Sequence, residues 1–102
     1  MPMAPTEPIS APERERRLQQ LRVRFLRRAN AELAQVASSK QHAALDRVAH
    51  SLRGTGAALG FTELSSEAAA LERAMSAFAP GGELEVLLER LREAVRRDLA
   101  RS

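Results

Sequence analysis

Most of the chemistry that this sequence of 102 residues could perform centres on one histidine and its neighbours. His50 lies in the segment AHSLRGTGAALG, residues 49–60, where leucine and alanine recur at helical spacing. An imidazole titrates near neutral pH and can act as a nucleophile. Arg53 follows three residues later and places a fixed positive charge beside the ring on a helix. This pair indicates a site for an anionic group, and a phosphoryl group fits because guanidinium pairs with its oxygens.

Two glycines interrupt the helical pattern just after His50. Each glycine costs a helix about 1 kcal/mol relative to alanine. On a helical wheel with Leu45 at the origin, His50 falls about 140° away and Gly54 about 180° away, both opposite the apolar stripe. Gly54 and Ala57 therefore leave the approach to the ring clear, because a larger side chain at i+4 would shield it. Gly56 falls on the apolar side, where we expect it to permit close helix packing.

Other chemistry at His50 has less support. The second histidine, His42, is eight residues earlier, and a zinc site normally needs three or four ligands. Asp46 could pair with His50 but cannot complete a metal shell, so we expect no bound metal. Ser51 and Thr55 point to other faces of the helix, so no hydrolytic nucleophile accompanies the ring. A surface histidine without a chemical role is the general alternative.

The histidine must be positioned by helices, because apolar residues recur at steps of three and four along the chain. A first helix is predicted from about residue 13 to a break at Ser38, Ser39 and Lys40. The second helix carries His50, and the third and fourth follow it. The predicted apolar stripes are, in chain order, Leu18, Leu21, Phe25, Ala29, Leu33 and Val36; Leu45, Val48, Ala49, Leu52 and Leu59; Leu64, Ala68, Leu71, Met75 and Phe78; and Leu84, Leu87, Leu88, Leu91, Val95 and Leu99.

The ends of these helices carry recognisable signals. Gly60 fits a C-cap for the second helix, and Thr62 is the expected N-cap of the third. The run APGG at 79–82 predicts the turn before the fourth helix. Short connections make neighbouring helices antiparallel, which predicts an all-α, up-down-up-down four-helix bundle with His50 on the second helix.

Composition agrees with one helical domain. Aromatic residues make up 3% of the chain and cysteine is absent, so a leucine, valine, alanine and methionine core without disulfides is expected. The predicted domain occupies residues 13–102. Residues 1–12 hold four of the five prolines and no apolar period, which predicts a disordered tail.

Positive charge is concentrated in residues 13–28, which carry seven arginines and two glutamates. A solvated helix face is the favoured interpretation, although such a stretch could also attract an acidic protein, a membrane surface or nucleic acid. Nucleic-acid binding is disfavoured because neither stacking aromatics nor helix-turn-helix spacing accompanies the arginines. No apolar run approaches the roughly 20 residues that span a bilayer, and no secretory signal begins the chain. We therefore expect a cytoplasmic protein without a membrane partner, and nothing in the sequence requires more than a monomer.

Residues 48–75, VAHSLRGTGAALGFTELSSEAAALERAM, resemble the signature of a histidine-containing phosphotransfer (HPt) domain. That signature has a helical histidine, a leucine two later, then Lys-Gly, a small residue, a closing Leu-Gly, and a following helix that ends in Leu-Glu. The matching positions are His50, Leu52, Arg53, Gly54, Thr55, Leu59, Gly60, Leu64, Ala68, Leu71 and Glu72. Arg53 stands where lysine is commoner, which keeps the charge but changes the donor geometry. The arginine-rich first helix is not part of the family pattern.

The resemblance implies a phosphocarrier of a two-component phosphorelay, without independent catalytic activity. His50 would accept a phosphoryl group from the aspartate of one receiver domain and pass it to another, the receivers belonging to a hybrid histidine kinase or a response regulator. Mg²⁺ would sit on the receiver, so the chain itself is expected to hold no cofactor. Arg53 would partly neutralise the phosphoryl charge, and the docking surface would include Gly54, Ala57, Val23 and Leu26. The alternative is a non-catalytic helical docking module that regulates a histidine kinase or a response regulator.

Overall fold

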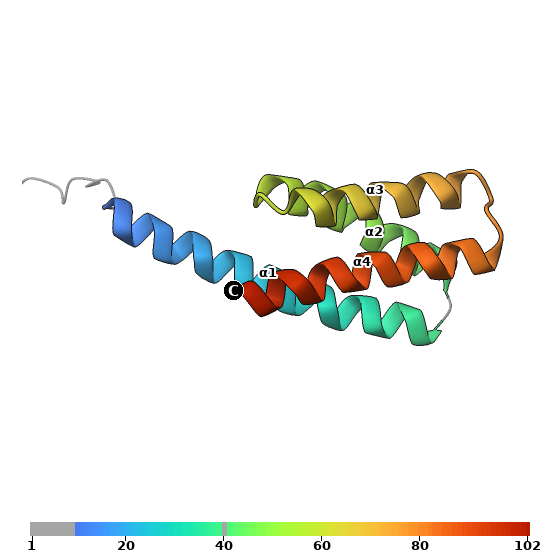
Figure 1. The fold of residues 1–102 in the computed structure, drawn as a ribbon, viewed down its shortest axis with the longest axis horizontal. Coiled ribbons are helices and arrows are strands. Elements are labelled where there is room, and N and C mark those ends of the chain that lie inside the picture. Colours follow the sequence, from blue (N-terminus) through green and yellow to red (C-terminus); the bar gives the residue numbers. More distant parts are fainter. Residues whose placement is uncertain (1–9, 40) are drawn as a thin grey trace, which may run out of the picture.

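Four helices account for nearly all of the structure. The computed structural model describes residues 10–39 and 41–102, and over these ranges it contains no strand. The helices are α1 (Ala11–Ser39), α2 (His42–Ala58), α3 (Thr62–Ser76) and α4 (Gly81–Arg101). Consecutive helices run antiparallel, and α4 returns to pack against α1, so the four enclose one core (Figure 1). This confirms the predicted up-down-up-down bundle and places His50 on the second helix.

The core is a single cluster of aliphatic side chains drawn from all four helices. Most of its members come from the predicted stripes, with Leu26 and Ala94 as additions that the stripes did not include. Burial of such a stripe on each helix supplies the main stabilisation, because most helical stability in a protein comes from packing of the apolar face. The buried hydrophobic residues are Leu26, Ala29, Leu33, Val36, Leu45, Ala49, Leu52, Leu64, Ala68, Leu71, Leu84, Leu91, Ala94 and Val95.

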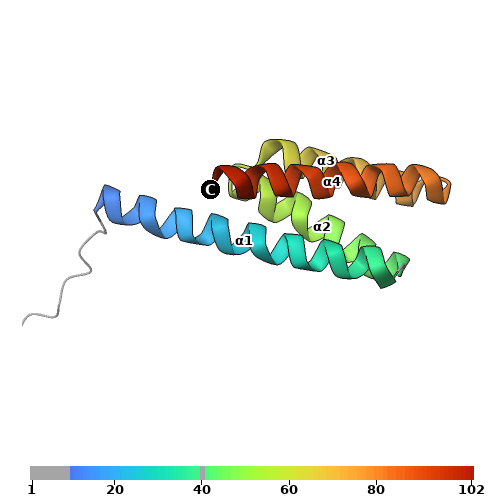
Figure 2. The ribbon, with the colours of Figure 1, turned by 60° about the horizontal axis from the view of Figure 1, so that its bottom comes forward.

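Helix α1 is longer than its partners, and its first part projects past the C-terminal end of α4 (Figures 1 and 2). The ring of Phe25 stacks on that of Phe61, with centroids 5.8 Å apart. Because Phe61 follows the end of α2, α2 does not extend past the turn of α1 that contains Phe25. Leu21 lies one turn before Phe25 on α1 and is 51% exposed. Its predicted place in the buried stripe is wrong, because periodicity shows which side a residue faces but not where the neighbouring helix stops.

The start of α1 lies two residues before the predicted boundary. Ser10 caps it: the Glu13 amide donates to the Ser10 hydroxyl at 3.3 Å, and the Arg14 amide donates to the Ser10 carbonyl at 2.9 Å. Pro12 is tolerated because a first-turn residue needs no intrahelical N–H bond. Ala11 and Pro12 are thus helical, and the rest of the predicted tail, residues 1–9, lies outside the described residues.

The predicted break after α1 is displaced in the same way. Ser38 and Ser39 remain helical, and the Ser39 hydroxyl donates to the Val36 carbonyl at 3.3 Å, which satisfies a carbonyl of the last turn. Lys40, the third residue of the predicted break, lies outside the described residues.

The end of α2 is a Schellman motif. Gly60 has φ +88°, and its amide donates to Ala57 at 3.1 Å while the Phe61 amide donates to Gly56 at 2.8 Å. The C-cap itself is Leu59, one residue before the predicted position, and Gly60 is the left-handed residue that ends the helix as predicted. Thr62 is not the N-cap of α3, however, because Phe61 occupies that position and Thr62 is already the first helical residue. The stacking of Phe61 on Phe25 fixes this residue at the cap without a side-chain hydrogen bond.

The α3–α4 connection repeats this motif with an unusual residue. Phe78 adopts φ 55°, its amide donates to Met75 at 3.1 Å, and the Ala79 amide donates to Ala74 at 3.0 Å. Phe78 is therefore outside the helix and 93% exposed, so its predicted place in the third apolar stripe is wrong. The turn lies where APGG predicted it, but the two glycines form the first turn of α4, with Pro80 as N-cap.

Candidate functional site

Helix α2 turns His50 outward and keeps its surroundings open. Ala49 and Leu52 are buried on the opposite side, and the His50 side chain is 67% exposed. A Cβ placed on Gly54 would meet nothing within 4 Å, and Ala57 is exposed one turn further on. The wheel placed these residues on the outer face, and the structure agrees.

Gly56 brings the neighbouring helix close to this face. A Cβ at Gly56 would lie 3.0 Å from Cδ2 of Leu64, a contact too short for a buried side chain to accept without moving. This confirms that Gly56 permits close packing of α2 against α3. Next to it, the Ser65 hydroxyl donates to the Arg53 carbonyl at 2.7 Å, which ties the two helices together beside His50.

The close packing places a carboxylate of α3 against the histidine. The Nδ1 atom of His50 lies 2.9 Å from Oε2 of Glu72, and the Glu72 side chain is only 20% exposed. Oε1 of the same carboxylate lies 2.7 Å from Nε of Arg53, and Nη2 of Arg53 lies 3.3 Å from Nδ1 of His50. The Nε–H bond of Arg53 does not point at Oε1, so the two groups form an ion pair but not a hydrogen bond. Oε1 therefore has no hydrogen-bond partner among the described residues. His50, Arg53 and Glu72 form one connected group.

The contacts of Nδ1 assign the tautomer of His50. An ionised carboxylate only accepts hydrogen bonds and a guanidinium only donates them. The shorter contact is the one to Glu72, so Nδ1 carries the proton and donates it to Oε2. The lone pair of a neutral ring then resides on Nε2, which is the nitrogen without a protein partner among the described residues. In this arrangement Glu72 fixes the orientation of the ring through Nδ1, and Nε2 is left to act as a nucleophile.

Sequence reasoning did not assign this role to Glu72. Asp46, one turn before His50 on α2, was the carboxylate that could pair with the ring by spacing, but the carboxylate that binds Nδ1 comes from another helix. A spacing of 22 residues carries no local geometric signal. The only clue was the position of Glu72 at the end of the HPt-like signature.

Of the two docking residues predicted on α1, Leu26 is buried and Val23 is half-buried. Leu26 is 1% exposed and belongs to the core, so its assignment to the docking surface is wrong. It lies three residues before Ala29 and seven before Leu33, which puts it on the inward side of α1. Val23 is half-buried beside Arg24 and Arg27 in a shallow groove of α1.

The arginine-rich part of α1 is partly accounted for by contacts within the chain. Nε of Arg22 donates to the Leu59 carbonyl at 3.0 Å, which satisfies a carbonyl at the C-terminal end of α2. Arg17 and Arg28 form ion pairs on their own helix, with Glu13 at 3.4 Å and Glu32 at 2.7 Å. These contacts agree with a solvated helix face.

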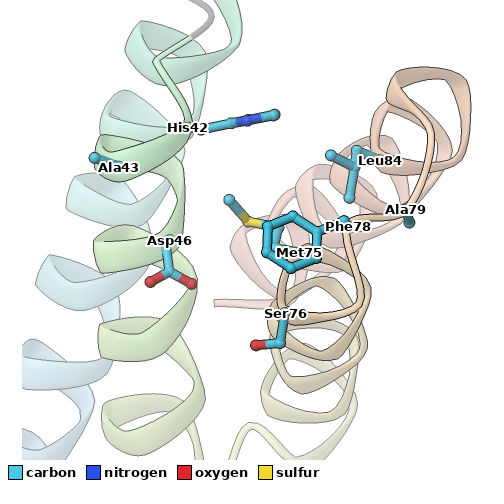
Figure 3. A pocket seen from close by; sticks show the side chains of 8 residues that line it. All are labelled: His42, Ala43, Asp46, Met75, Ser76, Phe78, Ala79 and Leu84. Carbon is cyan, nitrogen blue, oxygen red and sulfur yellow. The ribbon is translucent and has the colours of Figure 1, made fainter.

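A second groove lies at the opposite end of α2, away from His50 (Figure 3). His42 extends from α2 toward the α3–α4 turn, and Met75 extends from α3 toward α2. Asp46 lines this groove as well, together with Phe78. Among the described residues, no three histidine, cysteine or acidic side chains gather closely enough to hold a metal ion. The groove therefore offers apolar contact but no constellation of reactive groups.

The fold and the outward histidine together define a class: a four-helix bundle that presents an imidazole to a partner is the architecture of a histidine phosphotransfer module. Comparison with known families agrees, since the Hpt domain model matches residues 10–101, and the chain belongs to that family. Comparison with curated proteins and with solved structures gave no match. Hpt domains are phosphocarrier modules that interact with receiver domains in two-component phosphorelays. No helix within the described residues is long and apolar enough to cross a membrane.

Proposed function

We propose that this chain accepts a phosphoryl group on Nε2 of His50 from the aspartyl phosphate of one receiver domain and passes it to the aspartate of another. The observation that carries the proposal is the engagement of Nδ1 by Glu72, because it leaves Nε2 as the available nucleophile on a side chain that is 67% exposed. The receivers would belong to a hybrid histidine kinase and a response regulator in the cytoplasm, and the chain would act as a monomer.

The transfer step balances without moving a proton. Nε2 attacks the phosphorus atom, the bond between phosphorus and the aspartate oxygen breaks, and the aspartate leaves as a carboxylate. Nδ1 keeps its proton, so the phosphorylated ring carries a positive charge that the carboxylate of Glu72 balances. The second transfer is the reverse step on another receiver. Mg²⁺ and most of the transition-state stabilisation are assigned to the receiver, so the chain acts as a carrier rather than an independent enzyme.

Arg53 is assigned to the phosphoryl group as a charge-neutralising residue. Its guanidinium lies beside the ring, with Nη2 3.3 Å from Nδ1. It is held there by Glu72 and by the short helix segment between the two side chains. Gly54 and Ala57 clear the surface on which the receiver docks, and Val23 on α1 is kept as a proposed docking residue.

The experiment is transfer from phosphorylated receivers to the purified chain. Wild-type protein should acquire label that is acid-labile and base-stable, as expected for phosphohistidine. His50→Gln should acquire none while its circular dichroism spectrum stays helical, and His42→Gln should be labelled like wild type. If no cognate receiver labels the wild type, the proposal fails. A His50→Ala variant that retains full signalling in cells would instead favour the docking-module alternative.

The role of Gly54 has its own test. Gly54→Leu adds a side chain into space that is empty in the free protein, so the bundle should stay folded while transfer slows. The matched variant is Ala100→Leu, an exposed helical position at the end of α4. Equal transfer rates for Gly54→Leu and wild type would show that access to the ring does not depend on this glycine.

A further inference from the structure

An open concavity lies between α2 and α3 beside the His50 group. Arg53, Glu72 and Arg73 line it together, and its other members are the small residues Ala69, Ser76 and Ala77. Glu72 joins this concavity to the ring, because its Oε2 accepts from Nδ1 of His50 at 2.9 Å. Two arginines thus share one concavity next to the nucleophile, and only Arg53 has been given a role.

The side chain of Arg73 differs from that of Arg53 in having no polar partner among the described residues. Arg53 is paired with Glu72 at 2.7 Å, whereas the Arg73 guanidinium forms no hydrogen bond or ion pair with any residue that the structure describes. By contrast, Arg97 on α4 is paired with Glu63 at 2.6 Å. Arg73 is also exposed, so its charge is neither compensated nor buried.

The neighbours of Arg73 leave its side chain room to move. Ala69 lies four residues before it, Ser76 three residues after it and Ala77 four residues after it, all on the adjoining surface of α3. None of these side chains extends beyond a hydroxymethyl group. A long guanidinium side chain can therefore swing across them toward the α2 side of the concavity.

After transfer, the charges of His50, Arg53, Glu72 and the phosphoryl group do not balance without a second cation. Before transfer, a neutral His50 ring, an ionised Glu72 and a charged Arg53 sum to zero. Phosphorylation adds a group with about two negative charges and gives the ring one positive charge. The group as a whole then carries about one uncompensated negative charge, because the ring and Arg53 contribute two positive charges against about three negative charges from Glu72 and the phosphoryl group. A second cation within reach would neutralise it.

We propose that Arg73 is that cation, and that its guanidinium engages the phosphoryl oxygens on Nε2 of His50 when the ring is phosphorylated. This inference rests on the proposed function and deepens it. Arginine suits the role because its planar donors match phosphoryl oxygens in pairs. Arg73 then acts on the phosphorylated state and not on the free bundle.

The test measures the overall equilibrium constant for phosphoryl exchange between a receiver and the chain. This constant compares free phosphorylated and unphosphorylated proteins, so docking contacts cancel from it. Arg73→Gln should shift the equilibrium toward the phosphorylated receiver by about three- to tenfold, because one partly exposed charge-assisted contact is lost. Arg73→Lys should recover part of the shift. Arg90→Gln, which removes an exposed arginine on α4, is the matched control and should leave the equilibrium unchanged.

The outcomes separate this inference from the function on which it rests. An Arg73→Gln variant with the wild-type equilibrium constant overturns the inference, even if its transfer is slower, because a rate effect alone would place Arg73 in contact with the receiver and not with the phosphoryl group. Failure of wild type to accept label on His50 overturns the proposed function itself. Arg73→Gln and Arg73→Lys should keep the helical circular dichroism spectrum of wild type, since the Arg73 side chain forms no hydrogen bond or ion pair with the residues that the structure describes.

Discussion

Nδ1 of His50 and Oε2 of Glu72 are 2.9 Å apart, although 22 residues, including the connection between α2 and α3, separate them along the chain. One hydrogen bond therefore fixes the tautomer, the ring orientation and the free nitrogen at once. It also couples the chemistry of α2 to the packing of α3, because Glu72 reaches the ring only if the two helices stay close.

Replacing Glu72 should slow phosphotransfer without unfolding the protein. Glu72→Ala removes the acceptor for Nδ1–H, and we expect the single-turnover transfer rate from a phosphorylated receiver to fall about tenfold or more, as loss of a hydrogen bond to a charged group implies. Glu72→Gln keeps an acceptor but not the charge, so its rate should be intermediate. Glu67→Ala, another glutamate of α3, provides the control. Transfer by Glu72→Ala at the wild-type rate would contradict the assigned role.

The two glycines that follow His50 should respond oppositely to the same substitution. Gly54→Ala should raise the free energy of unfolding by up to about 1 kcal/mol, because the new methyl group enters empty space and alanine favours the helix. Gly56→Ala places its methyl group 3.0 Å from Leu64, so it should be less stable than Gly54→Ala by about 1–3 kcal/mol. Urea denaturation of the two variants measures this difference directly. Equal stabilities would mean that Leu64 can move aside at no cost.

Replacing Phe78 with glycine should stabilise the protein. Phe78 holds φ 55° at the C-terminal end of α3, a conformation that costs an L-residue about 1 kcal/mol or more and that glycine adopts freely. Little apolar burial is lost because the side chain is 93% exposed. We expect Phe78→Gly to raise the free energy of unfolding by about 1 kcal/mol, measured by urea denaturation.

The control for this prediction is Val86→Gly, which replaces an exposed residue within α4. That variant should be destabilised by roughly 0.5 kcal/mol, because glycine is a poorer helix former than valine. A loss of stability in Phe78→Gly comparable to that in Val86→Gly would show that Phe78 contributes more by contact than it costs in backbone strain.

Replacing Arg22 should weaken the end of α2. Its Nε donates to the Leu59 carbonyl at 3.0 Å in a partly buried position, so Arg22→Met leaves that carbonyl without its side-chain partner. We expect a loss of about 1 kcal/mol in the free energy of unfolding and faster amide exchange near Gly60. Arg24→Met is the matched control, because Arg24 is exposed on the same helix and makes no such bond. The idea fails if both variants unfold at the same urea concentration.

The helical period of the apolar residues was enough to predict the bundle, the helix that carries His50 and the outward direction of its ring. The predictions from this period were wrong at three residues: Leu21, Leu26 and Phe78. Leu21 was misassigned because α2 ends before reaching it, and Phe78 because a Schellman motif removes it from the helix it appeared to continue. Leu26 was misassigned because it was read as a surface residue although it shares the inward side of α1 with Ala29.

The sequence by itself determined the position of the proposed nucleophile His50, its exposed helix face and the adjacent Arg53, because these depend on a period of 3.6 residues within one helix. Only the tertiary structure decided which carboxylate binds Nδ1 and that Arg73 lines one concavity with Arg53 and Glu72. Those relations join α2 to α3, and their geometry depends on how closely two separate helices approach. That approach is set by a missing side chain at Gly56, whose Cβ would meet Leu64 at 3.0 Å. Periodicity within a helix cannot supply such a distance between helices.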